Sequence, residues 1–474
     1  MTKRTINIIL FFTGIIGLVF IFWWLSANPT KDFTINLEGA DNRGEGNAFV
    51  QQVNIGEHFE EFSSDYTEMN ETWPRFRGED FDNISKSPVK LIEKFGTEGP
   101  KILWSMDLGE GHSGAAIYKG LAYVLDYNEE ERADVLRCIS LVDGKEQWNR
   151  GYDVAVKRNH GMSRTIPAVT EDYIVTIGPK CHVMCLDRET GDFRWGLDIV
   201  KEYNNEIPFW YTGQCPLVDN GVAILATGGS ALMVAIDCET GQKLWETPNP
   251  NNWEMSHSSI MPFTFAGRKM YVYSSIGALT GIAADGPDAG KVLWETSAWN
   301  HSVVAPSPVC MPDGKIFMTA GYGAGSMMLQ LSESNGDFSI EPLDEYEPKD
   351  GLACEQQTPV YWNGCLFGIM PKDGGAMRNE FICVHPSDTK KIVWTSGKET
   401  RFGMGPYFIA DNKFFILNDD GTLTIARAST EKYIQLEQVN IIEDGHDAWA
   451  PFALADGYLL MRDSKKMVCI DLNI

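Results

Sequence analysis

Two stretches, CLDRETGDFRW from Cys185 to Trp195 and AIDCETGQKLW from Ala235 to Trp245, carry the same pattern. The shared positions are an aspartate, a Thr-Gly pair and a tryptophan: Asp187, Thr190, Gly191 and Trp195, then Asp237, Thr240, Gly241 and Trp245. Asp and Thr side chains close tight turns by hydrogen bonds to the backbone, and Gly adopts a positive φ at no steric cost. The pattern therefore predicts a turn and then a strand whose tryptophan wedges between neighbouring repeats.

These tryptophans belong to a longer series along the chain. Its members are separated by 44, 47, 50, 49 and 100 residues: Trp104, Trp148, Trp195, Trp245, Trp294 and Trp394. The last interval is two periods, and Leu343 lies near the skipped position. Prolines form a second series with similar intervals: Pro167, Pro216, Pro262, Pro308, Pro359, Pro406 and Pro451. Ala115 takes the place of proline in the first unit, so the proline series predicts eight units.

Each proline opens a short apolar strand, a tight turn and a second strand, as in PLVDNGVAILATG from Pro216 and PFALADGYLLMRD from Pro451. Asn-Gly and Asp-Gly pairs between β-rich runs are hairpin signals, and proline is tolerated at the first residue of a strand. A third strand and a fourth, tryptophan-bearing strand follow. Four strands per period, without a helical stretch of useful length, predict an all-β fold, an eight-bladed β-propeller.

The two ends of the chain are expected to close the ring. The last unit ends at Ile474 after its third strand, KMVCIDL, and so lacks an outer strand. The segment KILWSMDLG around Trp104 precedes the first complete hairpin and can supply that strand. Such closure removes the exposed sheet edges that invite aggregation.

An apolar run, INIILFFTGIIGLVFIFWWL over residues 6–25, precedes the repeats and predicts a transmembrane anchor. Twenty helical residues span roughly 30 Å, and Lys3 and Arg4 before the run put residues 1–5 in the cytoplasm. A cleaved signal peptide is the competing interpretation, although Leu25-Ser26-Ala27 matches a small-x-small cleavage site poorly. On either reading the remainder is exported. We expect a single-pass protein of a bacterial inner membrane with its propeller on the periplasmic side.

Residues 26–72 are rich in Asp, Glu, Asn and Gly and lack a sustained period, so we expect an acidic, flexible tether before a propeller over residues 73–474. The net charge of −25 argues against a nucleic-acid partner, because such binding needs a basic footprint.

The turn motif resembles the tryptophan-docking repeat of the pyrroloquinoline-quinone-type propellers, the quinoprotein alcohol dehydrogenase-like family. Two repeats match in full, and those that end at Trp148, Trp294 and Trp394 match in part. WPRFRG, from Trp73 to Gly78, resembles the leader that often precedes such propellers in exported bacterial proteins. The resemblance covers residues 73–474 and implies the fold, whereas the motif itself is structural.

The repeat also bears on the cysteines. Four of them fall where Ala235 and Ala283 stand, so we expect a small buried packing position there: Cys138, Cys185, Cys383 and Cys469. The spacing of Cys181 and Cys185 has no matching second pair, which makes a structural zinc site improbable. The sequence leaves open the disulfide state of four thiols: Cys181, Cys215, Cys354 and Cys365.

The loops that lead into the innermost strands converge around a propeller's axis, and they contain five of the eight histidines. The candidate ligand-face residues are His112, His160, Trp210, Tyr211, His257, His301, Glu355, Gln356, Arg401, His446, Asp447 and Trp449. Three readings are open: hydrogen bonding between blades, a ligand- or protein-binding face, and catalysis. Glu355 and Asp447 are the carboxylates to test as calcium ligands or as a base.

Two functions follow. The resemblance implies a dehydrogenase that oxidises an alcohol or sugar with pyrroloquinoline quinone and calcium, but the chain lacks the adjacent Cys pair and the C-x-x-C-H haem segment of many such enzymes. The other is a non-catalytic binding or scaffolding module for protein partners. One form of it resembles the propeller lipoprotein of outer-membrane β-barrel assembly. We favour a second form, a membrane-tethered propeller whose face meets a periplasmic or surface protein.

Overall fold

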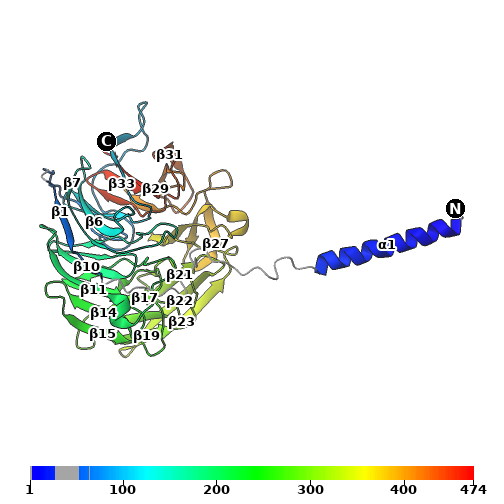
Figure 1. Ribbon diagram of the computed structural model, residues 1–474, viewed down its shortest axis with the longest axis horizontal. Coiled ribbons are helices and arrows are strands. Elements are labelled where there is room, and N and C mark those ends of the chain that lie inside the picture. The colour runs from blue at the N-terminus through cyan, green and yellow to red at the C-terminus, as the bar shows by residue number, and fades with distance from the viewer. Residues whose placement is uncertain (1–2, 27–52, 63–64) are drawn as a thin grey trace. The chain divides into compact units, whose positions relative to one another are not determined.

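The structure, a computed structural model, describes residues 3–26, 53–62 and 65–474 (Figure 1). The chain divides into two compact units, residues 1–47 and 48–474. The first unit contains helix α1 (Lys3–Ser26). Its segment Lys3–Trp24 has a mean hydropathy of 2.5 and is long and apolar enough to cross a membrane. The predicted N-terminal apolar helix is therefore confirmed.

The second unit consists of eight antiparallel sheets, the blades of a β-propeller (Figure 1). The first four blades, each from inner to outer strand, are β4 (Ala115–Tyr118), β5 (Leu121–Asn128), β6 (Ala133–Ser140), β7 (Glu146–Asp153); β8 (Ala168–Val169), β9 (Tyr173–Ile177), β10 (His182–Asp187), β11 (Phe193–Asp198); β12 (Leu217–Asp219), β13 (Val222–Ala226), β14 (Ala231–Asp237), β15 (Lys243–Pro248); and β16 (Met261–Phe265), β17 (Arg268–Ser274), β18 (Leu279–Ala283), β19 (Val292–Thr296). A short helix, α2 (Ile199–Tyr203), follows blade 2.

The last four blades repeat this order. They are β20 (Val309–Cys310), β21 (Lys315–Ala320), β22 (Gly325–Ser334), β23 (Asp337–Tyr346); β24 (Val360–Trp362), β25 (Cys365–Ile369), β26 (Phe381–His385), β27 (Asp388–Thr395); β28 (Tyr407–Ala410), β29 (Lys413–Leu417), β30 (Thr422–Arg427), β31 (Gln435–Asn440); and β32 (Ala453–Ala455), β33 (Tyr458–Arg462), β34 (Lys466–Asp471), β3 (Lys101–Asp107). A 3-10 turn, η1 (Gly375–Met377), lies within blade 6. The predicted all-β, eight-bladed fold is confirmed.

Blade 8 combines the two ends of the propeller, as expected. Strand β3 pairs with the C-terminal strand β34, and Trp104 lies opposite Cys469. The predicted small position recurs in three other blades, where Cys138, Cys185 and Cys383 lie opposite Trp148, Trp195 and Trp394. A tryptophan directly across a strand pair leaves room for a small side chain only, which explains the preference for Cys and Ala.

The docking turns have the predicted geometry. The carboxylate of Asp187 accepts hydrogen bonds from the backbone N–H groups of Glu189 and Thr190, both at 3.0 Å. Gly191 has a φ of 71°, and a Cβ atom there would lie 2.9 Å from the ring of Trp148 in the preceding blade. Glycine is needed both for the backbone conformation and for the close approach of the indole.

Three blades depart from the predicted pattern, and in blade 7 it is Glu437 that takes the place of tryptophan, opposite Ile425. In blade 4, Gly281 lies opposite Trp294, whereas Ala283 pairs with Met270. The small position was therefore assigned to the wrong residue there, because the turn in this blade is longer. In blade 5, Asp344 takes the place of tryptophan, next to the exposed Leu343. Asp344 pairs with Lys390 of blade 6 at 2.7 Å, so an ion pair replaces the indole contact.

All ten cysteines are free thiols, and nine of them are buried. This group includes the four whose disulfide state the sequence left open: Cys181, Cys215, Cys354 and Cys365. Burial raises the pKa of Cys215 to about 11 and that of Cys181 and Cys354 to about 12. These thiols are protonated at neutral pH and poor nucleophiles.

The segment before the propeller differs from the expected tether. Residues 27–52 lie outside the described residues. Strand β1 (His58–Glu61) adds to the outer strand β7 of blade 1, with His58 opposite Gly151. Strand β2 (Thr72–Trp73) pairs with the inner strand β4. The described residues from β1 onward therefore belong to the disc. Hydropathy did not indicate this, because the side chains of β1 are exposed.

Residues 71–85, here called the plug, lie against inner strands of several blades. The Pro74 carbonyl accepts a hydrogen bond from Val169 of blade 2, and Ile84 bridges to Ile409 of blade 7. Trp73 is buried edge-on against Phe408, with ring centroids 5.6 Å apart. Because inner strands surround the axis of a propeller, the plug crosses its central channel.

Candidate functional site

The predicted ligand-face residues all lie in the loops that lead into the inner strands. These loops, here called the entry face, are 108–114, 154–167, 204–216, 249–260, 297–308, 347–359, 396–406 and 441–452. Because strands alternate in direction, the turns between second and third strands lie at the same end of the blades as the entry face. The hairpins between first and second strands, and the docking turns, lie at the opposite end.

His112 is held within the entry face. Its Nε2 lies 3.1 Å from the carbonyl oxygen of His160, and its ring centroid lies 4.9 Å from that of Trp449. Burial, together with the charges of Arg164 and Arg462, lowers the pKa of His112 to about 3. His112 is therefore neutral at physiological pH and acts as a hydrogen-bonding group between blades.

Two charged residues that the sequence did not single out fix the loop around His160. Arg164 donates to the carbonyls of Asn159 and His160, both at 2.8 Å. Glu110 accepts from the N–H of Gly161 at 3.1 Å, and its other oxygen accepts from Arg158 at 2.6 Å. These bonds join the loops of blades 1 and 2. No local motif marks these residues, because their partners belong to loops that fold against each other.

An aromatic group spans blades 3 to 5 of the entry face. Trp210 packs near His257 at 6.1 Å and stacks on Tyr322 at 5.7 Å with an interplanar angle of 20°. Tyr322 is 68% exposed and has a φ of 58°. The buried Tyr211 donates its hydroxyl to the carbonyl of Lys157 at 2.6 Å. Tyr322 was not among the predicted residues, because it lies in a turn between a second and a third strand and not in a loop that leads into an inner strand.

The remaining histidines occupy different environments. Burial, followed by the charge of Arg164, lowers the pKa of His257 to about 4. The ring of His301 lies 4.3 Å from the buried Trp299, and burial lowers its pKa as well. His446 is exposed, and its Nδ1 lies 3.0 Å from the Asp447 carboxylate. The five histidines therefore do not converge on one ion.

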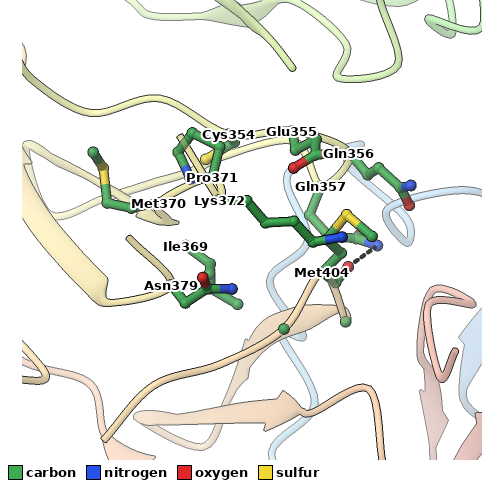
Figure 2. Close-up of a pocket in the computed structure, with 12 residues that line it drawn as sticks. Cys354, Glu355, Gln356, Gln357, Ile369, Met370, Pro371, Lys372, Asn379 and Met404 are labelled. Carbon is green, nitrogen blue, oxygen red and sulfur yellow. Dashed lines mark hydrogen bonds between the residues drawn. The ribbon is translucent and has the colours of Figure 1, made fainter. Parts of the chain in front are cut away.

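Glu355, Gln356 and Gln357 line a small pocket (Figure 2). The pocket volume is about 10 Å³, which is room for about one water molecule. Gln357 donates to the carbonyl of Trp449 at 3.0 Å and so ties the loops of blades 6 and 8 together. Burial raises the pKa of Glu355, and the positive charge of Lys372 partly opposes this shift.

A third carboxylate, missed by the sequence analysis, lies near the two that it nominated. Asp419 accepts hydrogen bonds from Trp449 Nε1 and from the N–H of Met404, both at 2.8 Å. Burial raises the pKa of Asp447, and the charge of Asp419 adds to the rise in the pKa of both Asp447 and Glu355. This region of the entry face is therefore acidic.

Arg401 does not join that acidic region through any described ion pair. Its guanidinium lies 3.5 Å from the buried Glu380 and donates to backbone carbonyls, among them that of Lys398 at 3.1 Å. Arg401 therefore holds the loops of its own part of the disc together.

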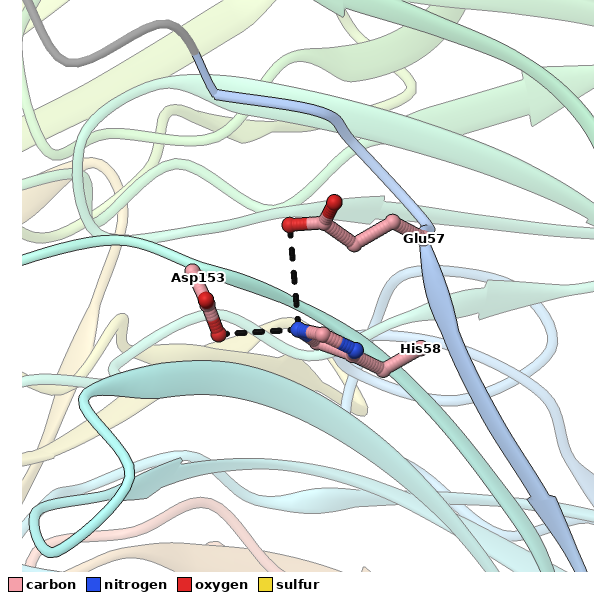
Figure 3. Close-up of side chains that lie close together, drawn as sticks. All are labelled: Glu57, His58 and Asp153. Carbon is pink, nitrogen blue, oxygen red and sulfur yellow. Dashed lines mark hydrogen bonds and ion pairs between the residues drawn. The ribbon is translucent and has the colours of Figure 1, made fainter.

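The pocket beside Glu355 is too small for a quinone cofactor. Pyrroloquinoline quinone is a planar tricycle, whereas the pocket beside Glu355 holds about one water molecule. Within the described ranges, three metal-donor side chains come close together elsewhere: Glu57, His58 and Asp153 (Figure 3). His58 Nε2 lies 2.8 Å from Asp153 and 3.7 Å from Glu57, and all three are exposed. These contacts fasten β1 to β7.

A family profile described as outer membrane protein assembly factor BamB matches residues 94–257 and 131–336, which together span just over half of the chain. No curated protein matches the chain in sequence.

Several solved structures share the fold. The chain aligns with BamB from Moraxella catarrhalis at 11% identity and a TM-score of 0.53, over 78% of this chain and 99% of that one. A europium-containing methanol dehydrogenase aligns at 11% identity and a TM-score of 0.59, over 85% and 98%. The quinohemoprotein alcohol dehydrogenase ADHIIG from Pseudomonas putida HK5 aligns at 13% identity and a TM-score of 0.58, over 85% and 80%. At these identities the likeness shows the fold alone.

Proposed function

The chain belongs to the family of outer membrane protein assembly factor BamB, and on this basis we propose that it is a non-catalytic scaffold whose entry face binds a protein partner. The observation that carries the proposal is that several polar side chains of the entry face make their contacts within the protein itself. His112 packs against Trp449, and Gln357 and Asp419 hold the surrounding loops. Such a face is rigid and preorganised, which lowers the entropy cost of binding a partner.

The aromatic pair Trp210 and Tyr322 is the proposed centre of that interface. Exposed tryptophan and tyrosine side chains are enriched among the residues that dominate binding energies. Tyr322 exposes 68% of its surface although its ring is already stacked, so its position is fixed before a partner arrives. The acidic region around Asp419 would then form part of the polar rim and favour a partner with basic side chains.

We further propose that helix α1 anchors the protein in a bacterial inner membrane, with the propeller on the periplasmic side. Length and hydropathy support a membrane span, and Lys3 and Arg4 support a cytoplasmic N-terminus. A net charge of −25 makes nucleic acid an unsuitable partner.

A quinone-dependent dehydrogenase that oxidises an alcohol or sugar is the alternative. One observation favours a polar ligand at the entry face: His112 Nδ1 and His257 Nε2 are buried and lack a hydrogen-bond partner among the described residues. Ordered water satisfies such atoms equally well.

Site-specific photocrosslinking of the full-length protein in cells tests the scaffold. A photoreactive phenylalanine at position 322 should form one defined adduct, which Trp210→Ala should reduce at least five-fold. The matched control is the same probe at Leu244, an exposed position on an outer strand. The proposal fails if the purified protein, given pyrroloquinoline quinone and calcium, shows dye-linked oxidation that Glu355→Gln abolishes.

A further inference from the structure

The leader WPRFRG contains two arginines, and the structure uses them differently. Arg77 is almost fully buried, and four of its five N–H groups donate to backbone carbonyls. Its guanidinium donates to the carbonyl oxygens of Phe81, Asp82, Thr358 and Pro359 at 2.7–3.3 Å. Burial lowers the pKa of Arg77 to about 10, so it remains charged at neutral pH. Its role is complete within the protein.

Arg75 lacks such partners. Its Nε is buried, and no acceptor among the described residues lies within hydrogen-bond distance of it. The guanidinium lies over the ring of Phe81, 5.2 Å from the centroid. Burial lowers the pKa of Arg75, and the charges of Glu79 and Asp219 partly oppose this shift. These carboxylates accept hydrogen bonds from Thr72 and Tyr271, at 3.1 and 2.9 Å, and none from Arg75 is described. A half-buried guanidinium without an acceptor is costly unless something else supplies one.

Arg75 borders a cavity of about 260 Å³ between the plug and blades 3 and 4. Much of the wall is apolar, with contributions from Phe81, Leu217, Phe263 and Met270, and it includes one carboxylate, that of Asp219, whose Oδ2 accepts a hydrogen bond from Tyr271. Lys269, which is exposed, adds a second positive charge. The volume is slightly below the roughly 300–1,000 Å³ of pockets that hold drug-sized ligands. The cavity is therefore suited to a small molecule with an apolar body.

We propose that this cavity binds a small carboxylate that carries an apolar body, such as an aromatic acid. The guanidinium of Arg75 receives the carboxylate, Lys269 adds attraction, and the apolar wall encloses the rest of the ligand. Arginine matches the planar geometry of a carboxylate with two parallel hydrogen bonds. A phosphate ester fits less well, because the Asp219 carboxylate in the largely apolar wall repels a doubly charged group more strongly than a singly charged one.

The cavity is separate from the proposed protein-binding face. Its lining residues Asp219 and Lys269 lie next to the hairpins between first and second strands, whereas the entry face lies at the other end of those strands. Ligand binding in the cavity therefore does not depend on the scaffold function. It would give the leader motif a role that the scaffold function leaves unexplained.

Calorimetric titration of the full-length protein in detergent with benzoate tests the proposal. We expect saturable binding at one site per chain and at least ten-fold weaker binding of neutral benzamide, because a hydrogen bond to a charged group is stronger than one between neutral groups. Arg75→Gln should weaken benzoate binding at least ten-fold. Lys269→Gln should weaken it by up to about five-fold, as expected for an exposed charge.

Lys432→Gln is the matched control, since it removes one exposed positive charge on blade 7 and should leave binding unchanged. Ala284→Leu fills part of the cavity without altering a charge and should also abolish binding, which keeps the test decisive if Arg75→Gln misfolds. Circular dichroism of each variant checks folding. Three outcomes would each overturn the proposal. They are equal binding of benzoate and benzamide, unchanged benzoate binding by a folded Arg75→Gln protein, and no saturable benzoate binding at millimolar concentrations.

Discussion

The indole of Trp104 donates a hydrogen bond from Nε1 to the carbonyl oxygen of Leu141 at 2.8 Å. Trp104 lies on the outer strand of blade 8 and Leu141 follows the third strand of blade 1, so the bond lies where the ring closes. The same indole packs on Gly144, whose φ is 71°. The start and the end of the propeller are therefore joined by the same docking contact that joins blades within it.

Trp104→Ala should weaken that closure. The change removes a partly buried indole and its hydrogen bond, and we expect a loss of about 3 kcal/mol in the free energy of unfolding. Denaturant unfolding monitored by circular dichroism measures it. Leu244→Ala, at an exposed position of an outer strand, should change stability by less than about 0.5 kcal/mol. Equal effects of the two substitutions would contradict the role given to Trp104.

A pair of glycine substitutions separates backbone strain from indole packing. Both glycines have a positive φ, 71° at Gly191 and 91° at Gly336. A Cβ atom added at Gly191 would lie 2.9 Å from the ring of Trp148, whereas a Cβ atom added at Gly336 would have no neighbour within 4 Å. Gly336→Ala should cost about 1–2 kcal/mol and Gly191→Ala about 1–3 kcal/mol more. Thermal unfolding of both variants gives the difference. If the two costs are equal, the indole contact does not constrain the turn.

The turn chemistry explains why the blades were predictable and the plug was not. Asp187, Thr190 and Gly191 act within one short segment, so their pattern is visible in the sequence. The plug depends on contacts such as Asn83 with the carbonyl of Tyr407, more than 300 residues away, and it has no internal period. Asp419 was missed for the same reason, because its role depends on Trp449 in another loop.

Arg77 should be essential for holding the plug. Arg77→Met keeps much of the side-chain volume but leaves buried carbonyls without donors, and it should destabilise the protein by about 3 kcal/mol. Arg75→Met should cost less than about 1 kcal/mol, because Arg75 donates no described hydrogen bond. Denaturant titration compares the two leader arginines directly. A larger loss for Arg75→Met would refute this assignment.

Asp134 should make stability depend on pH. Burial raises the pKa of Asp134 to about 7, with a further contribution from Asp126, while the hydroxyl of Tyr152 donates to it at 2.8 Å. The folded protein therefore binds a proton that the unfolded chain releases near pH 4. This stabilisation is full below about pH 4 and is lost as the pH rises through about 7. In the parent protein, Asp134 should lower the free energy of unfolding by on the order of 2–4 kcal/mol as the pH rises between these values. This decline should be absent from the pH profile of Asp134→Asn.

Tyr322 offers a test that separates binding from folding. Its φ of 58° is strained for an aromatic residue, and asparagine adopts such a conformation more readily. Tyr322→Asn should therefore leave the free energy of unfolding within about 0.5 kcal/mol of the parent while removing the ring that stacks on Trp210. With the photoreactive probe moved to exposed His160, the substitution should reduce the adduct at least five-fold, since hot-spot aromatics contribute about 2 kcal/mol or more. An undiminished adduct in a protein of unchanged stability would show that the aromatic pair is not the centre of the interface.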